Sequence, residues 1–470
     1  MTTRETASGP SPDFSSQRGE KSAPERTDVL DAAATSAAPD FGAFDAHHPP
    51  ARELLDDCVH CGFCLPTCPT YALWGEEMDS PRGRIYLMEM AERGEIPLEG
   101  AFTTHLDRCL GCMACVTACP SGVQYDRLLE ATRPQIERHV PRTRADRWFR
   151  EGIFALFPYK RRLRAASLGG ALYQKLRPKS MDRLLAKLPA RFERLVAMES
   201  LLPPVRVRDA FATLPARTPA VGPRRGRVGM LTGCVQDVFF HPVNQATARV
   251  LAAEGYDVVA PREQGCCGAL GLHAGREEES IARAKELIAV FERAEVDTVA
   301  VNVAGCGSSM KEYGELLADE PGWAERGAAF AAKVRDISEV LADALTEPRA
   351  RRQRVDATVV YHDACHLGHA QKIRTQPREV LRSIPGVTLV ELPEAEICCG
   401  SAGIYNMLQP EAAGDLGRRK ADNIRGTGAD LLVTANPGCL LQIRKYLADD
   451  LPMLHPVQLL DASIRGVRPF

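Results

Sequence analysis

Residues 58–69 have the sequence Cys58-Val-His-Cys61-Gly-Phe-Cys64-Leu-Pro-Thr-Cys68-Pro69, and residues 109–120 repeat this spacing as Cys109-Leu-Gly-Cys112-Met-Ala-Cys115-Val-Thr-Ala-Cys119-Pro120. Three cysteines at intervals of three, then a fourth followed by proline, are typical of [4Fe-4S] loops, whose fourth cysteine ligates the other cluster. We therefore assign one cluster to Cys58, Cys61, Cys64 and Cys119. We assign the second cluster to Cys109, Cys112, Cys115 and Cys68.

Structural zinc and disulfides are the alternatives for these cysteines. Zinc sites use ligand pairs separated by a longer loop, whereas each of these stretches is a run of four cysteines ending in Cys-Pro. Disulfides would require an exported protein, and residues 1–30 contain no continuous apolar core of a signal peptide. Sixteen cysteines without an export signal instead indicate a reducing compartment, where thiolates stay available for metal.

The chain has 470 residues, which predicts about three domains. Its apolar share of 45% is ordinary, and its net charge of -2 favours neither an acidic nor a basic partner. No apolar run approaches the roughly 18 residues that span a bilayer. Residues 1–49 are rich in small, polar and charged side chains, so we predict a disordered leader. The acidic residues in this segment argue against an organelle transit peptide.

Residues 50–140 contain both cysteine runs and form the predicted two-cluster ferredoxin domain. Between the runs, Pro81-Arg-Gly-Arg is followed by an apolar segment, which predicts a turn and an amphipathic helix. The side chains of Arg82 and Arg84 either offset the negative charge of a thiolate-ligated cluster or are solvated.

Residues 141–226 form a predicted basic helical linker. From Arg142 to Arg227 there are 21 Lys and Arg against 6 Asp and Glu, a local charge of +15. Aromatic residues are interleaved with Lys160, Arg161, Arg162 and Arg164. This mixture suits contact with an anionic membrane surface or docking to an acidic partner, and a linker with a solvated basic face is the alternative. Nucleic-acid binding is not favoured, because no recognised nucleic-acid fold accompanies the charge.

The remaining sequence contains an internal repeat, which we place at residues 227–350 and 351–470. Each copy has a cysteine, a Cys-Cys-Gly and a last cysteine, separated by 31 and 38 residues in the first copy and by 32 and 39 in the second. Buried strands are predicted at 228–231, 298–303, 358–361 and 431–434. Helices are predicted at 243–254, 277–293 and 411–425. Alternation of strands and helices predicts a parallel α/β unit used twice.

Each repeat brings four cysteines to the ends of predicted strands, where ligands gather in parallel α/β units. We predict that these cysteines bind further iron-sulfur cofactors, against a structural or redox-dithiol alternative. They are Cys234, Cys266, Cys267 and Cys306 in the first copy and Cys365, Cys398, Cys399 and Cys439 in the second. The fold class we expect is α/β, with an N-terminal helical two-cluster ferredoxin domain and two repeated parallel α/β Cys-Cys-Gly domains.

The chain resembles the iron-sulfur subunit of glycolate oxidase, also called glycolate dehydrogenase. The resemblance covers residues 52–465 and rests on motifs that include Cys58-Val-His-Cys-Gly-Phe-Cys64, Pro81-Arg-Gly-Arg-Ile-Tyr86, Gly265-Cys-Cys-Gly-Ala269 and Cys398-Cys-Gly-Ser-Ala-Gly403. It implies a subunit that carries electrons from flavin-containing partner subunits, which oxidise glycolate to glyoxylate, toward the respiratory chain. Its implied location is cytoplasmic, with peripheral contact to the inner face of the cell membrane and its quinone pool as a further expectation.

The repeats are also similar to those of heterodisulfide reductase and of lactate-utilisation and anaerobic glycerol-3-phosphate dehydrogenase subunits. In the fullest form of that motif, a fifth cysteine stands three residues before the last one. Val303 and Asn436 occupy those positions here. Each repeat therefore offers four thiolates, which leaves a cubane, an oxygen-supplemented site or an empty site as alternatives.

We expect an electron-transfer subunit with no catalytic residues of its own. No Gly-x-Gly-x-x-Gly follows a predicted strand, so a dinucleotide fingerprint is missing. His362, His366 and His369 follow a strand and serve either as hydrogen-bond donors to a cluster or as structural residues. The rival functions are an iron-sulfur subunit for lactate or glycerol 3-phosphate, a heterodisulfide-reductase-like enzyme, and an iron-sulfur sensor.

Overall fold

The computed structural model describes residues 41–470, except 179, 186, 190–191, 448–450 and 470. Residues 1–40 of the predicted leader lie outside the described residues. For residues 41–49 the prediction of disorder is wrong. Phe44 is buried with its ring 6.1 Å from that of Phe102, and the Asp45 carboxylate accepts hydrogen bonds from the Arg138 guanidinium at 2.9 and 3.0 Å. The overall composition did not indicate that this segment is ordered, because only two aromatic residues, Phe41 and Phe44, attach it to the core.

The cysteine runs lie in a helical domain with one apolar core. The helix predicted after Pro81 is confirmed as α3, Pro81–Glu92. Ser80 caps its N-terminus, where Ser80 Oγ accepts a hydrogen bond from the Gly83 amide at 3.0 Å. Its buried face includes Ile85, Met88 and Ala91. The other elements are α1 Arg52–Asp56, α2 Pro69–Trp74, η1 Glu77–Asp79, α4 Ala101–Asp107, α5 Ala114–Ala118 and α6 Tyr125–His139.

The basic segment is helical, as predicted. Thr143 caps its first helix by accepting from the Asp146 amide at 3.2 Å. The helices are α7 Arg144–Leu156, α8 Lys160–Leu176, α9 Met181–Leu185, α10 Glu193–Ser200 and α11 Val207–Ala210. The segment ends in a strand that we did not predict, β1 Arg217–Thr218, which pairs antiparallel with β3 of the first repeat.

The first repeat forms a sheet of order β1-β3-β2-β4-β5, in which all pairs except β1-β3 are parallel. Its strands are β2 Gly226–Met230, β3 Tyr256–Val259, β4 Thr298–Val301 and β5 Val334–Asp336. Its helices are α12 Val235–Phe239, α13 His241–Ala253, α14 Ala269–Leu272, α15 Glu277–Arg293, α16 Ala304–Lys311, α17 Tyr313–Leu316, α18 Ala324–Ala331 and α19 Ile337–Ala344.

The second repeat forms an all-parallel sheet of order β7-β6-β8-β9. Its strands are β6 Ala357–His362, β7 Val387–Val390, β8 Leu431–Thr434 and β9 Met453–Leu454. Its helical elements are a π-helical turn η3 His366–Ala370, α20 Thr375–Arg382, α21 Tyr405–Leu408, α22 Pro410–Gly426, α23 Pro437–Leu447 and α24 Pro456–Arg465. The order β3-β2-β4-β5 of the first sheet matches this order strand for strand, which confirms the predicted parallel unit used twice.

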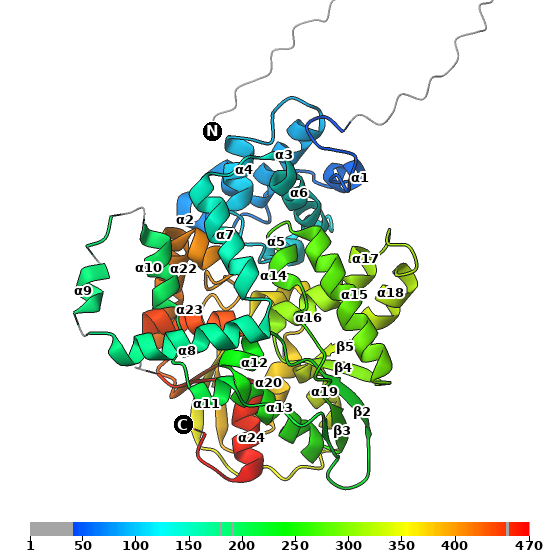
Figure 1. Ribbon diagram of the computed structural model, residues 1–470, viewed down its shortest axis with the longest axis vertical. Helices are drawn as coiled ribbons and strands as arrows, with labels where there is room; N and C mark the ends of the chain where they lie inside the picture. The colour runs from blue at the N-terminus through cyan, green and yellow to red at the C-terminus, as the bar shows by residue number, and fades with distance from the viewer. Residues whose placement is uncertain (1–40, 179, 186, 190–191, 448–450, 470) are drawn as a thin grey trace, which may run out of the picture. The chain divides into compact units, whose positions relative to one another are not determined.

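The two sheets share one apolar core. Val228 and Met230 of β2 belong to the same buried cluster as Val359 and Tyr361 of β6. Helix α13 of the first repeat packs on α24 of the second, and the two helices lie side by side in Figure 1. Burial of apolar surface at this junction holds the repeats together. It thereby fixes the relative positions of the strand ends that carry the cysteines.

Candidate iron-sulfur sites

The two ferredoxin loops repeat one backbone conformation. His60 and Gly62 of the first loop have φ of 51° and 87°, and Gly111 and Met113, at the matching positions of the second loop, have φ of 62° and 61°. A left-handed conformation is costly for His60 and Met113, because both carry a Cβ atom. The same left-handed conformation at the same two positions in both loops, kept even where the residue is not glycine, indicates that the turns serve to direct the neighbouring cysteines.

The first loop gathers the cysteines that we assigned to one cluster. Cys58, Cys61, Cys64 and the distant Cys119 line one cavity, together with the apolar Val59. Burial raises the pKa of the Cys58 thiol, and the nearby Cys119 and Cys61 raise it further. Cys61 is exposed, so this site reaches the protein surface.

The second group is buried. Burial raises the pKa of the Cys112 and Cys115 thiols well above the usual range, and Cys109 and Cys68 raise both further. Cys68 is thus close to the second loop, although it belongs to the first run. The structure brings together the thiols that cross-ligation requires, and ligation itself stays a prediction.

Arg84 supplies positive charge to the buried group. Its side chain is 1% exposed, donates to the His105 carbonyl at 2.7 Å and to Thr70 Oγ1 at 3.1 Å, and has an Nη atom 3.9 Å from Cys68 Sγ. Burial opposes ionisation of Cys109, but Arg84 and then Arg133 lower the pKa of its thiol below the ordinary value. Of the two predicted roles for this arginine, the structure supports charge compensation.

Arg82 has a different environment. Its guanidinium donates to the Glu77 carboxylate at 2.6 Å and to the His60 carbonyl at 3.0 Å near the surface. It therefore holds the backbone of the first loop. Arg133, which sequence reasoning missed, donates to the Cys109 carbonyl and to the His273 carbonyl, both at 2.7 Å.

The first repeat brings its four cysteines together. Cys234 follows β2, and Cys234 Sγ lies 3.5 Å from Cys266 Sγ. Contact with the Cys266 thiol, then with that of Cys306, and burial raise the pKa of the Cys267 thiol well above its usual range. Gly268 has φ of 84°, a conformation that glycine tolerates best, and directs the two adjacent cysteines into the site.

The second repeat has the same arrangement. Cys365 follows β6, the pair Cys398 and Cys399 precedes Gly400 at φ of 88°, and Cys439 lies in the first turn of α23. The thiols form a continuous row in which Cys398 contacts Cys365 and Cys399, and Cys399 contacts Cys439. The Asn436 amide, at the position of the missing fifth cysteine, donates to Cys439 Sγ at 3.4 Å.

These donor sets fit iron-sulfur clusters. All sixteen cysteines lie among the described residues, and each is a free thiol. They form four groups of four, and most of them are buried. A buried thiolate is costly unless a cation compensates its charge, and iron is such a cation.

The ferredoxin domain and the second repeat meet at their cysteines. Cys112 shares an apolar cluster with Cys365 and Cys398. Burial is the largest cause that raises the pKa of the Cys112 thiol, and the neighbouring Cys365 is the next largest. Next to this contact, Thr117 Oγ1 lies 2.8 Å from His369 Nδ1. The sequence gave no indication that these sites are neighbours.

Two of the three histidines noted in the sequence have protein partners in this region. His369 also hydrogen-bonds through Nε2 to the Glu396 carbonyl at 3.0 Å, and His366 Nδ1 lies 3.5 Å from Cys365 Sγ. His362 lies beside Cys399 and Cys439. His366 and His362 therefore line the second repeat's site, whereas His369 links the two domains.

Two cationic side chains of the basic helix α8 have partners inside the protein. Lys160 Nζ donates to Thr232 Oγ1 at 2.8 Å, and Arg164 donates to the Asp237 carboxylate at 3.1 Å. Both partners belong to the first repeat, close to Cys234. Burial lowers the pKa of Lys160. The prediction of a free membrane-binding or docking surface is therefore wrong for Lys160 and Arg164, whose charges are used inside the protein.

Family models match three regions of the chain. A 4Fe-4S dicluster domain matches residues 54–123, and a cysteine-rich domain matches residues 228–311 and 359–444. The linker region of glycolate oxidase iron-sulfur subunits matches residues 145–202. The fold and its cysteine sites thus define an iron-sulfur protein with a dicluster domain and two cysteine-rich domains.

Relatives identify the family. The chain is 41% identical to the probable glycolate oxidase iron-sulfur subunit of Bacillus subtilis over 394 residues, which cover 83% of this chain and 88% of that one. It is 37% identical to the glycolate oxidase iron-sulfur subunit of Escherichia coli, over 83% of this chain and 89% of that one. The chain belongs to the family of glycolate oxidase iron-sulfur subunits.

A partial relative covers less of the chain. Lactate utilization protein A of an Exiguobacterium strain is 30% identical over 241 residues, which cover 51% of this chain and 98% of that protein. Among the helices of the described residues, none is long and apolar enough to cross a membrane.

Proposed function

We propose that this chain is the electron-transfer subunit of a glycolate oxidase complex and that its partners are flavin-containing subunits. Oxidation of glycolate to glyoxylate releases two electrons and two protons, which a flavin accepts together. Bound iron-sulfur clusters supply one-electron carriers. The two electrons then leave the flavin one at a time through this chain, toward a quinone or another respiratory acceptor. Family membership supports this role.

The observation that carries the proposal is the row of cysteine sites. The group around Cys58 is partly exposed, Cys68 and Cys109 lie deeper, and Cys112 adjoins Cys365. Three sites in near contact form a path from the surface to the second repeat. The fold of this chain holds the cysteines in that row. In the middle group, the positive charge of Arg84 lowers the cost of ionising the Cys109 thiol.

The exposed Cys58 site is the one that best allows electrons to pass between this chain and a partner chain. Val59 and Phe63, in the same loop, are 68% and 66% exposed. Large apolar side chains exposed beside a redox centre favour a protein-protein contact. We therefore propose that a partner subunit covers this loop, and that the complex is cytoplasmic because its thiols need a reducing compartment.

Two experiments test the proposal. The chain alone, purified anaerobically, should not reduce a dye with glycolate, and addition of its flavoprotein subunits should restore dye reduction. Robust turnover by the isolated chain would overturn the subunit role. The complex should also prefer glycolate to lactate. A preference for lactate would instead support the function named for the relatives that match half of the chain.

A further inference from the structure

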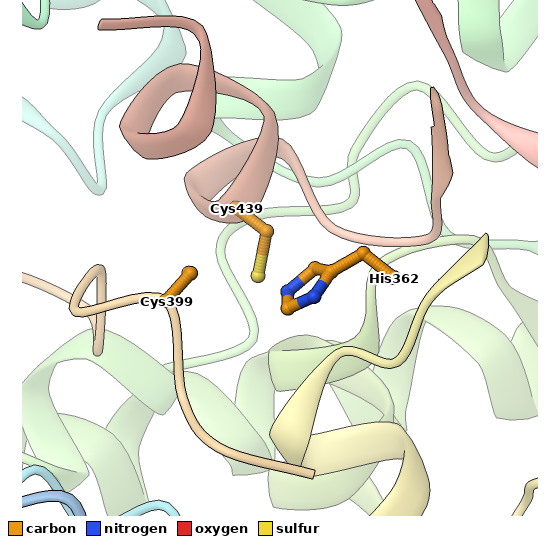
Figure 2. A group of neighbouring side chains, drawn as sticks. All are labelled: His362, Cys399 and Cys439. Atoms are coloured by element: carbon orange, nitrogen blue, oxygen red, sulfur yellow. The ribbon is translucent and has the colours of Figure 1, made fainter. Parts of the chain in front are cut away.

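His362 is a buried histidine whose imidazole lacks hydrogen-bond partners. It is the last residue of β6 and is 1% exposed, and neither Nδ1 nor Nε2 has a partner among the described residues. Its ring and the sulfur atoms of Cys399 and Cys439 offer ligand atoms that all lie within 4.8 Å of one another. Figure 2 shows the imidazole and the Cys439 sulfur turned toward each other. A ring buried in this way is costly unless something else binds it.

A structural histidine of this protein has a different environment. His455 is equally buried, but its Nε2 is 3.0 Å from the Asn302 carbonyl and its Nδ1 accepts from the Val457 amide at 3.2 Å. Both nitrogens of His455 are therefore used in the protein. The two free nitrogens of His362 instead face a site built from thiols.

The two repeats differ at this position. His362 stands three residues before Cys365, and Leu231 stands three residues before Cys234. Leu231 is buried in an apolar cluster with Cys267. At this position the first repeat therefore has an apolar side chain, whereas the second has an imidazole.

We propose that His362 is a metal ligand in the second repeat and binds iron of an iron-sulfur centre beside Cys399 and Cys439. The repeats then hold two different centres, one with thiolate ligands alone and one with a mixed cysteine and histidine set. This inference rests on the proposed presence of iron-sulfur clusters in the repeats. His362 supplies the ligand that Asn436 cannot, since the amide of Asn436 already donates to Cys439.

The ligand set has a consequence for electron transfer. A neutral imidazole in place of a thiolate leaves the centre with less negative charge, which favours its reduced form, as in clusters where histidine replaces cysteine. The second repeat's centre should therefore have a higher reduction potential than the same centre with a thiolate at position 362. Since its site adjoins Cys112, it would accept electrons from the ferredoxin domain.

The test compares anaerobically purified full-length variants. His362→Leu copies the first repeat at Leu231, and His362→Cys restores a ligand as a thiolate. His366→Gln is the matched control, because this neighbouring buried histidine also lies in the site. Protein labelled with nitrogen-15 in histidine is reduced in steps and examined by pulsed electron paramagnetic resonance, and iron and sulfide are measured chemically.

In the wild type, one reduced centre should show coupling to a histidine nitrogen. The coupling should persist in His366→Gln and vanish in both His362 variants. His362→Cys should keep the iron and lower the potential of that centre, whereas His362→Leu should lose part of the iron. The signals of the ferredoxin clusters should stay unchanged, which shows that the variants fold.

Three results would overturn the proposal. They are a wild type without histidine coupling to any centre, coupling that survives His362→Leu, and repeats that hold zinc or no metal. None of them bears on the subunit role, because glycolate-dependent dye reduction by the complex tests that role separately.

Discussion

Cys112 and Cys365 are neighbours in the same buried cluster, although one belongs to a ferredoxin loop and the other to the second repeat. Under the proposed function, this contact would make the second cysteine-rich domain a continuation of the electron path through the ferredoxin domain. If the Cys109 group and the second repeat each held a cluster, Cys112 and Cys365 would place these two clusters next to each other. The first repeat has different neighbours, because Lys160 and Tyr313 are among the groups next to its thiols.

Metal content is the most direct prediction. Anaerobically purified protein should contain about eight irons from the ferredoxin domain, at four per cube, and more from occupied repeats. Iron, acid-labile sulfide and zinc are measured on the same sample. Zinc with negligible iron and sulfide would contradict the assignment of all four sites.

Cross-ligation predicts which cluster each cysteine affects. Cys68→Ser should damage the cluster of Cys109, Cys112 and Cys115, because Cys68 lies with that group. The matched variant Cys119→Ser should instead damage the cluster of Cys58, because these two thiols are neighbours. Electron paramagnetic resonance of each reduced variant separates the two signals. Damage confined to the sequence neighbours of the replaced cysteine would show that each run holds its own cluster.

The sequence predicted those features that depend on residues close together in the chain. Cysteine spacing predicted which thiols come together, and the hydrophobic pattern predicted helices such as α15, whose bounds at Glu277 and Arg293 agree with the structure. The pattern did not predict the contact between Cys112 and Cys365, because tertiary packing of distant segments creates it. For the same reason, charge counting treated Lys160 as a surface group. Its partner Thr232 is distant in sequence and has no charge.

We expect Arg84 to affect both the unfolding free energy of the protein and the reduction potential of the cluster beside Cys109. Arg84→Met leaves the fully buried Asp79 without one of its cationic partners, so the variant should lose about 3–5 kcal/mol of unfolding free energy. Removal of a positive charge beside Cys109 should also lower the reduction potential of that cluster and raise the pKa of the Cys109 thiol.

Arg82→Gln is the control for Arg84. Its ion pair with Glu77 is partly exposed, so the loss should be about 0–1 kcal/mol. Anaerobic denaturant unfolding and redox titration measure both variants. Equal effects of the two substitutions would show that burial of Arg84 has no special role.

The exposed loop around Cys61 predicts where a partner binds. Phe63→Ser should slow glycolate-dependent electron transfer in the reconstituted complex and leave iron content unchanged, because Phe63 is 66% exposed. Val221→Ser, equally exposed at 66% but outside the ferredoxin domain, should have no effect. Stopped-flow reduction of the iron-sulfur chromophore by the flavin subunits measures the rate. An unchanged rate in Phe63→Ser would move the contact to another surface.

The basic helix α8 gives the last prediction. Lys160 and Arg164 both approach the Asp237 carboxylate, at 3.8 and 3.1 Å, and that carboxylate is mostly buried. Substitution of both by Gln should therefore remove the two cations of α8 from the Asp237 carboxylate and leave the His241 imidazole 3.3 Å away, and should cost about 1–3 kcal/mol of unfolding free energy. Arg161→Gln, on the same helix and exposed, should change stability by less than about 0.5 kcal/mol.

Anaerobic denaturant unfolding and flotation with anionic liposomes distinguish the structural role of these side chains from membrane binding. A structural role predicts lower stability in the double variant and the same liposome binding in all three proteins. Because the helix lies next to Cys234, the double variant should also change the spectrum of the first repeat's centre. Loss of liposome binding at unchanged stability would instead show that these charges face the membrane.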